Sequence, residues 1–280
     1  MDAVFTESQK SRLIELGVHK EELKQQFLHV KDREKMFAQM EREAVQANKQ
    51  MLRKLMEDTH KPQLCKLQQE LSDGLCGLGF TQVTTPVMIS QKLLGKMSII
   101  RGHPLEKQVY WVDSKTCLRP MLAPNLYEIS RQLMNASKLP IRVFEIGSCF
   151  RKESEGQAHL KEFTMLNLVE WGTEPDNRLN RLKELANSVL EICAVSEYQL
   201  KEETSVVYGT GLDVVGKNGL ELASTSMGPH PLDAAWKISC TWVGLGFGLE
   251  RLLMYRENSQ GIHRYSKSTS FLDGACLKIR

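Results

Sequence analysis

The chain has 280 residues, 41% of them hydrophobic and 25% charged, which suffices for one large globular domain or for a domain with an extension. Its net charge of +3 permits a polyanionic partner without requiring one, and neither an apolar run of bilayer length nor a secretory signal pattern is present. The seven cysteines are scattered without a CxxC pair, so we expect no zinc site, no disulfide framework and a reducing, cytoplasmic setting.

Residues 1–60 contain no Pro and one Gly, and their apolar residues are spaced as on amphipathic helices. We predict an N-terminal extension of two or three helices, distinct from a domain over residues 61–280. Acidic and basic residues nearly balance in the extension. This balance is typical of a solvated surface, and contact with RNA or with another partner is the alternative.

A helix with a regular leucine stripe is predicted over residues 61–79, followed by a strand over 80–89 that Pro86 interrupts. Because Pro86 cannot donate to a β-ladder, this strand is placed at a sheet edge or an interface. A further short strand is predicted over 108–112. On the next helix four residues share one face, which suits a pocket or the core: Ala123, Leu126, Tyr127 and Ser130.

Residues 141–171 are predicted to form an antiparallel hairpin, because two alternating apolar runs flank a charged loop. Alternation places Glu145 and Arg151 on one face of the first strand, and Phe163 and Asn167 on one face of the second. If the two sets face the same way, a cation, an aromatic ring and an amide converge on one pocket. The loop adds two polar residues, Glu153 and His159.

After the hairpin we predict a helix over 178–194, strands over 206–215 and 219–227, and a strand running into a helix over 242–256. The order of elements indicates an α+β fold with a mainly antiparallel sheet flanked by helices.

Three alternating glycines in the last strand, Gly244, Gly246 and Gly248, would present bare backbone on which a flat ligand can lie. Arg251 adds a cation in the first turn of the following helix. The glycine spacing differs from the dinucleotide-binding fingerprint. Close strand packing explains alternating glycines equally well when they are considered alone.

Together, three segments resemble the signature motifs of the class II aminoacyl-tRNA synthetases: the strand GFTQVTTPVMI, the hairpin sequences FRKE and EF, and the glycine-rich GFGLER. The sequence segments RPMLAPNLY, FEIGSCFRKES and HLKEFTMLNLVE are similar to the catalytic part of the pyrrolysyl-tRNA synthetases. The similarity is greatest to the short bacterial form, whose separate partner protein carries a further tRNA-binding domain. It covers residues 61–280 and implies a class II catalytic domain there.

The resemblance implies ATP-dependent activation of pyrrolysine and its transfer to the 3′ end of an amber-suppressor tRNA. The amino-acid carboxylate is itself the nucleophile, so catalysis would consist of positioning and charge stabilisation at the α-phosphate. Arg151, Arg251 and Glu221 are the implied catalytic residues. The implied ATP site comprises Arg151, Glu153, His159, Leu160, Phe163, Glu221, Leu222, Ser224, Gly248 and Arg251.

Glu221 and Ser224 occupy the magnesium positions that the resemblance implies, and Mg²⁺ accepts few protein oxygens because it keeps several waters. Residues three apart on a regular strand point to opposite faces, so a bulge or an irregular backbone must lie between them. The alternative is that Ser224 is an ordinary strand serine.

The implied amino-acid site is uncharged and comprises Ala123, Leu126, Tyr127, Ser130, Asn167, Val169, Tyr208, Ser226, Trp242 and Gly244. A lysine site would need an acid for the buried ammonium, so a bulky acylated side chain fits better. Asn167 would hydrogen-bond the amide carbonyl, unless backbone groups satisfy it, and Tyr208 would close over the ring. Val169 and Ser130 stand where archaeal members carry a cysteine and a bulkier apolar residue, which leaves the exact substrate fit open.

The implied partners are the tRNA, a second copy in a homodimer and a separate small tRNA-binding protein, with no membrane and no DNA. The leucine stripe and the Pro86 strand would form the two-fold interface. Basic residues within 10–54, together with His263, Arg264 and Lys267, would contact tRNA phosphates. Two alternatives remain: a class II synthetase for another bulky apolar amino acid such as phenylalanine, or a catalytically silent synthetase-like RNA-binding regulator.

Overall fold

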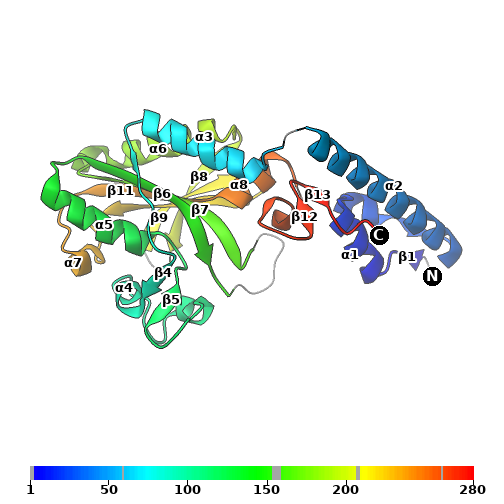
Figure 1. The fold of residues 1–280 in the computed structure, drawn as a ribbon, viewed down its shortest axis with the longest axis horizontal. Helices are drawn as coiled ribbons and strands as arrows, with labels where there is room; N and C mark the ends of the chain where they lie inside the picture. Colours follow the sequence, from blue (N-terminus) through cyan, green and yellow to red (C-terminus); the bar gives the residue numbers. More distant parts are fainter. Residues whose placement is uncertain (1–2, 59, 153–158, 206–208, 260) are drawn as a thin grey trace.

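A seven-stranded sheet forms the centre of residues 61–280 in the computed structural model, which describes residues 3–58, 60–152, 159–205, 209–259 and 261–280 (Figure 1). The strand order is β3-β6-β7-β11-β10-β9-β8, and only β3 pairs in parallel with its neighbour. The strands are β3 (Thr81–Gln82), β6 (Ile141–Phe150), β7 (Glu162–Trp171), β8 (Tyr198–Ser205), β9 (Gly209–Gly216), β10 (Glu221–Gly228) and β11 (Trp242–Gly248). The predicted mainly antiparallel sheet is confirmed.

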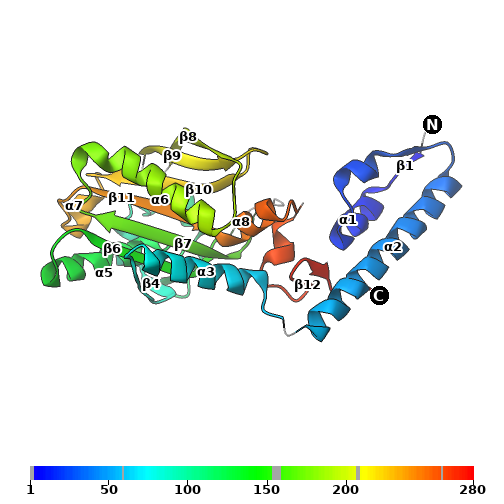
Figure 2. The ribbon, with the colours of Figure 1, turned by 90° about the horizontal axis from the view of Figure 1, so that it is seen from above.

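One face of the sheet is covered by α3 (Gln63–Gly77), α6 (Arg178–Ile192) and α8 (Leu249–Arg256) (Figure 2). The leucine stripe of α3 is buried there against sheet residues such as Phe144 and Phe247. Leu67, Leu71 and Leu75 are at most 1% exposed. The expectation that this stripe forms a two-fold interface is therefore wrong, because the chain's own core already covers it.

The opposite face carries α5 (Ala123–Ala136), α7 (Asp233–Trp236) and a second apolar core. Beside them lies a small sheet of β4 (Met88–Ser90) and β5 (Thr116–Leu118), with α4 (Gln91–Gly95) following β4. Pro124 stands in the first turn of α5, where its missing N–H costs no helical hydrogen bond. Side chains that point outward from this face of the sheet contact α5.

The N-terminal extension is helical as predicted, with α1 (Glu7–Leu16), the 3₁₀ helix η1 (Lys20–Lys24) and the long α2 (Val30–Glu57). A capping box begins α1, since Thr6 Oγ1 accepts from Gln9 N at 3.2 Å and Gln9 Oε1 accepts from Thr6 N at 3.0 Å. The extension also contains a short pair of strands, β1 (Ala3–Val4) and β2 (Gln26–Phe27), and it has a small apolar core of its own.

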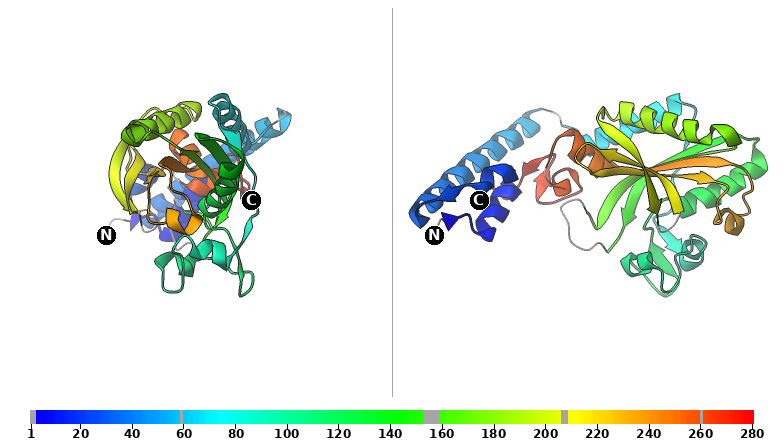
Figure 3. Two further views of the ribbon diagram at one scale, coloured as in Figure 1. Left: turned by 90° about the vertical axis from the view of Figure 1, so that its left-hand side faces the viewer. Right: turned by 180° about the vertical axis from the view of Figure 1, so that it is seen from behind.

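The C-terminal segment lies between the extension and the sheet (Figure 3) and contains η4 (Ile262–Tyr265), β12 (Phe271–Leu272) and β13 (Ala275–Cys276). Asn48 of α2, only 2% exposed, donates to Leu16 O at 2.8 Å and accepts from Cys276 N at 2.6 Å. Asp273 accepts from the first backbone N–H of α3 at 2.9 Å. This segment therefore joins the extension to the sheet domain.

The strand predicted over 80–89 is interrupted around Pro86, as expected, into β3, at the edge of the main sheet, and β4, in the small sheet. One strand prediction is wrong. Residues 108–112 are not a strand, because the 3₁₀ helix η2 (Pro104–Gln108) reaches their start and only Trp111 makes an isolated bridge. The sequence also gave no sign of β8 or of η3 (Pro175–Asn177). No helix in the described ranges combines the length and apolarity needed to cross a bilayer.

Candidate active site

Cross-strand register builds the site on the sheet face that α5 covers. In the β6–β7 hairpin Glu145 lies opposite Asn167, so the two predicted sets of alternating residues do face the same way. The row continues across the sheet, where Asn167 pairs with Gly246 and Gly246 pairs with Ser224. A Cβ on Gly246 would lie 3.2 Å from Asn167 Nδ2, so the glycine leaves room for the amide.

Arg151 and Phe163 meet at the open end of the hairpin. The Arg151 guanidinium carbon lies 5.3 Å from the centroid of the Phe163 ring, within the range of a cation–π contact. Its Nε donates to the carbonyl of Pro120 at 2.9 Å, and its backbone N–H donates to Lys161 O at 3.0 Å. These contacts fix the cation beside the ring.

Arg251, Glu221 and Ser224 form a second group. Arg251 Nη1 lies 3.4 Å from Glu221 Oε1, and Ser224 Oγ donates to that oxygen at 3.3 Å. The register of β10 against β9 shifts between Glu221 and Ala223, which confirms the predicted bulge. The bulge brings the carboxylate and the hydroxyl onto one side of the strand.

The antiparallel order places both groups at one end of the sheet. The last residues of β6 and β11 lie beside the first residues of β7 and β10, so Arg151, Phe163, Arg251 and Glu221 lie at the same end of these strands. Two cations, an aromatic ring and a carboxylate are groups that can bind a nucleotide and its phosphates.

The other implied nucleotide residues differ in accessibility. His159 is exposed, whereas Leu160 is buried with Phe163, Leu220 and Met254. Leu222 is 1% exposed and packs in the core behind the sheet, so its side chain is turned away from this face. Gly248 is the N-cap of α8. Glu153 and Tyr208 lie outside the described residues.

A cavity of about 80 Å³ lies between α5 and the sheet. It brings together most of the implied amino-acid residues: Ala123, Leu126, Tyr127, Val169, Ser226, Trp242 and Gly244. Trp171, Ser224, Thr225 and Leu245 also line it. All of these side chains are uncharged.

Ser130 and Asn167 do not line this cavity. Ser130 is fully buried in α5, and its hydroxyl has no hydrogen-bond partner among the described residues. Asn167 Oδ1 is also buried without a partner in the described part of the chain. The alternative of an asparagine satisfied by backbone is not supported for this oxygen, and a buried unsatisfied acceptor is costly unless a ligand or water meets it.

Two buried acids in this region were missed by the sequence reasoning. Asp233 is 4% exposed and accepts from Tyr127 Oη, a residue 106 positions away. Glu250 is 1% exposed, and both of its carboxyl oxygens accept from Thr164 N at 2.9 Å, which ties the first turn of α8 to β7. Glu250 directly precedes Arg251 in the GFGLER motif. This position next to a predicted site residue is the sequence feature that could have identified it.

The stability of the protein is expected to depend on the ionisation of Glu250. Burial raises the pKa of this carboxyl above its ordinary value of 4.5, so at a pH between the two pKa values the folded chain retains a proton that the unfolded chain has released. Stability should therefore fall as the pH rises through the raised pKa. Glu250→Gln keeps an acceptor for Thr164 N and cannot ionise.

Urea unfolding at several pH values between about 4 and about 8 measures this effect. The free energy of unfolding of the Gln variant should rise relative to wild type as the pH increases. Glu191→Gln, at an exposed position on α6, is the matched control and should show no such trend. A difference between Glu250→Gln and wild type that stays constant with pH would contradict the expectation.

Glu221 and Ser224 suit a magnesium ion that keeps most of its waters or binds phosphate oxygens, because they offer one carboxylate and one hydroxyl. Within the described residues no three His, Cys, Asp or Glu side chains gather as a denser ligand set. The donors present therefore fit Mg²⁺ held jointly with a nucleotide.

Comparison with known proteins agrees with this fold and site. A family model described as the phenylalanyl tRNA synthetase beta chain CLM domain matches residues 49–213, more than half of the chain. The pyrrolysyl-tRNA synthetase of Desulfitobacterium hafniense superimposes with a TM-score of 0.94 at 47% identity, covering 100% of both chains. A second structure, of PylSc from the same organism, gives 0.91 at 47% identity and 98% coverage of both.

Curated sequence relatives match over shorter regions. The O-phosphoserine–tRNA(Cys) ligase of Methanocorpusculum labreanum is 25% identical over 172 residues, 58% of this chain and 32% of that protein. The phenylalanine–tRNA ligase alpha subunit of Sulfurisphaera tokodaii is 34% identical over 130 residues, 45% of this chain and 27% of that protein. The chain thus spans about a third or less of the length of these curated relatives.

The antiparallel sheet, its flanking helices and the group of residues at its edge define a class II aminoacyl-tRNA synthetase. The match at 47% identity extends over the whole length, including β10, β11 and α8, which lie beyond the region matched by the phenylalanyl family model. The chain belongs to the pyrrolysyl-tRNA synthetase family.

Proposed function

We infer that the chain activates pyrrolysine with ATP and transfers it to the 3′ end of the cognate amber-suppressor tRNA. The observation that carries the choice of amino acid is the cavity under α5, whose walls are aromatic, aliphatic or hydroxylic and carry no charge. A free lysine ammonium there would be buried without a counter-charge, whereas the acylated side chain of pyrrolysine brings none.

In the first step a carboxylate oxygen of the amino acid attacks the α-phosphorus of ATP, and the bond to the pyrophosphate breaks. Arg151, held beside Phe163, would stabilise the charge that develops on the α-phosphate. We propose that Phe163 and Arg251 stack on the two faces of the adenine, that Glu153 reads its amino group and that His159 approaches the outer phosphates. In the second step a ribose hydroxyl of the tRNA attacks the activated carbonyl, and AMP leaves.

Glu221 and Ser224 would hold Mg²⁺ against the phosphates, where the ion neutralises charge on the leaving pyrophosphate. The salt bridge to Arg251 holds the Glu221 carboxylate at this end of the strands before the nucleotide binds.

For the amino acid, we propose that Asn167 hydrogen-bonds the acyl amide and that Tyr208 closes over the ring. Because a carbonyl only accepts, Asn167 Nδ2 would donate to the acyl carbonyl, and the unpartnered Oδ1 would accept from an N–H donor of the substrate. Ser130, which is buried in α5, and Val169, which lines the cavity, would tune the depth of the site.

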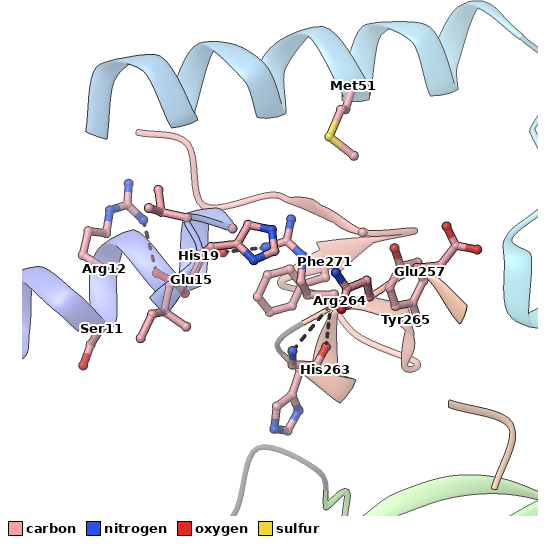
Figure 4. Close-up of a pocket in the computed structure, with 17 residues that line it drawn as sticks. Ser11, Arg12, Glu15, His19, Met51, Glu257, His263, Arg264, Tyr265 and Phe271 are labelled. Carbon is pink, nitrogen blue, oxygen red and sulfur yellow. Dashed lines mark hydrogen bonds and ion pairs between the residues drawn. The ribbon is translucent and has the colours of Figure 1, made fainter. Parts of the chain in front are cut away.

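A larger cavity, of about 750 Å³, separates α1 from η4 and β12, and we propose that this region contacts tRNA (Figure 4). Arg12, His19 and His263 lie around it. Arg264 has a structural contact as well, because it donates to Glu15 O at 3.1 Å and lies over the Phe271 ring. Lys267 pairs with Glu162 at 2.7 Å. RNA affinity arising from such cations would fall with salt.

We also propose that residues 1–60 act as a tRNA-contacting unit appended to a catalytic domain over 61–280. A homodimer in the cytoplasm and a separate small tRNA-binding protein complete the proposal. Exposed apolar side chains on or beside the β4–β5 sheet support the dimer, with Met88 58% and Val112 56% exposed. Of the interface expected from the sequence, the part on the Pro86 strand, which includes β4, stays in the proposal, and the buried leucine stripe is dropped from it.

Amino-acid-dependent pyrophosphate–ATP exchange tests the proposed function. Exchange with pyrrolysine or an Nε-acylated lysine, but not with phenylalanine or lysine, is the expected result. Exchange with phenylalanine alone would show a synthetase of different specificity, and no exchange with any amino acid would indicate a regulator. Either of those two outcomes overturns the proposal.

A further inference from the structure

Four aromatic rings form and support the walls of the amino-acid cavity. The centroid of the Tyr127 ring lies 5.2 Å from Trp171, 5.9 Å from Trp242 and 5.1 Å from Trp236. Tyr127, Trp171 and Trp242 line the cavity, whereas Trp236 stacks on Tyr127 at an interplanar angle of 22°. Because Tyr127 touches all three indoles, its placement decides where this wall of the cavity stands.

The polar atoms of two of these rings are bound by one carboxylate. Asp233 Oδ1 accepts from Tyr127 Oη at 2.9 Å, and its Oδ2 accepts from Trp242 Nε1 at 2.9 Å and from His230 N at 2.7 Å. Asp233 is only 4% exposed. An aspartate can accept all three hydrogen bonds, whereas a buried phenol or indole left without a partner is disfavoured.

Neighbouring contacts restrict the same rings. A Cβ on Gly228 would lie 1.8 Å from Trp242 Nε1, so this indole packs directly on the backbone of β10. Trp236 belongs to α7, as Asp233 does, so one short helix supplies both the hydrogen bond and the stacking contact to Tyr127. The Lys96 ammonium lies 4.3 Å over the Trp236 ring.

We propose that Asp233 is a positioning residue that sets the substrate specificity of this cavity. It holds Tyr127 and Trp242 in the orientations that form a fixed wall for the acyl end of the amino-acid side chain. Without the carboxylate both rings lose their acceptor and can rotate, so the cavity loses its defined limit. The identity of the ligand rests on the proposed function, while the contact set itself does not.

Asp233→Ala and Asp233→Asn separate positioning from mere stability. In the Asn variant Oδ1 can accept from Trp242 Nε1 and His230 N while Nδ2 donates to Tyr127 Oη, so the rings stay in place. In pyrophosphate–ATP exchange, Asp233→Ala is expected to raise the KM for an Nε-acylated lysine at least about tenfold and to leave the KM for ATP unchanged. The preference of the Asp233→Ala variant for that substrate over a lysine with a larger acyl group should also fall. Asp233→Asn should restore both the KM for the acylated lysine and this preference.

Tyr127→Phe provides a second reading that does not depend on the folding of the Ala variant. It removes one donor only, so it should raise the KM for the amino acid and add nothing when combined with Asp233→Ala. Unchanged selectivity in both Asp233→Ala and Tyr127→Phe, or an equal rise in both KM values, would overturn the positioning role. Failure of the wild-type chain to use any acylated lysine would instead overturn the proposed function.

Discussion

Arg151→Ala is expected to lower the kcat of pyrrolysine-dependent pyrophosphate exchange by a factor of about 100 or more, or roughly 3 kcal/mol of transition-state stabilisation. The guanidinium is fixed beside the Phe163 ring and by the carbonyl of Pro120, so it need not reorganise when charge develops on the α-phosphate. Exchange kinetics at saturating ATP and amino acid measure the loss directly. The free energy of unfolding should change little, because the side chain is only partly buried.

Two variants give this experiment its controls. Arg151→Lys keeps the charge but lacks the planar, forked donor, and should recover only part of the activity. Arg131→Ala removes a partly exposed arginine on α5 that pairs with Glu128, away from the proposed nucleotide residues, and should leave the exchange rate unchanged. An Arg151→Ala enzyme with wild-type kcat would show that this cation takes no part in the first step.

The largest loss of stability is expected for Glu145→Ala, at about 3–5 kcal/mol of unfolding free energy. Glu145 and Arg119 form a buried pair at 2.7 Å, with the two side chains 1% and 3% exposed. Thr85 also donates to Glu145, through its backbone N at 3.1 Å and its hydroxyl at 2.6 Å. Removing the acid would leave the Arg119 charge buried without its counter-ion.

Chemical denaturation of three proteins decides whether the pair behaves in this way. Glu184→Ala removes an exposed acid that pairs with Arg181 and should cost less than about 1 kcal/mol. The double variant Arg119→Met with Glu145→Leu removes both charges together and should regain much of the lost stability. A loss for Glu145→Ala no greater than that for Glu184→Ala would contradict the expectation.

The side-chain directions that sequence reasoning predicted follow from strand alternation. Alternation grouped the residues of each strand by face, and the register of β6 with β7, which places Glu145 opposite Asn167, shows that the two groups face the same way. The need for a bulge before Ser224 also followed from alternation, because residues three apart on a regular strand diverge. Such inferences succeed because backbone geometry alone fixes the direction of successive side chains.

Sequence reasoning failed where a choice between partners was required. The leucines of α3 were assigned to an interface, but they pack on the chain's own sheet. Residues 108–112 have the composition of a strand, yet no neighbouring strand pairs with them beyond the single bridge at Trp111. Nothing along the chain connects Asp233 with Tyr127, since they are 106 positions apart.

The sequence by itself determined the hairpin, the alternating glycines before Arg251, the helical extension and the set of motifs that identify the family, because each depends on a local period or on neighbouring residues. Only the tertiary structure decided that the leucine stripe is buried, that Arg119 pairs with Glu145 and that Asp233 accepts hydrogen bonds from two rings lining the cavity beside α5. A period states which face of an element is apolar or polar, but the element that covers that face is selected by packing between distant segments.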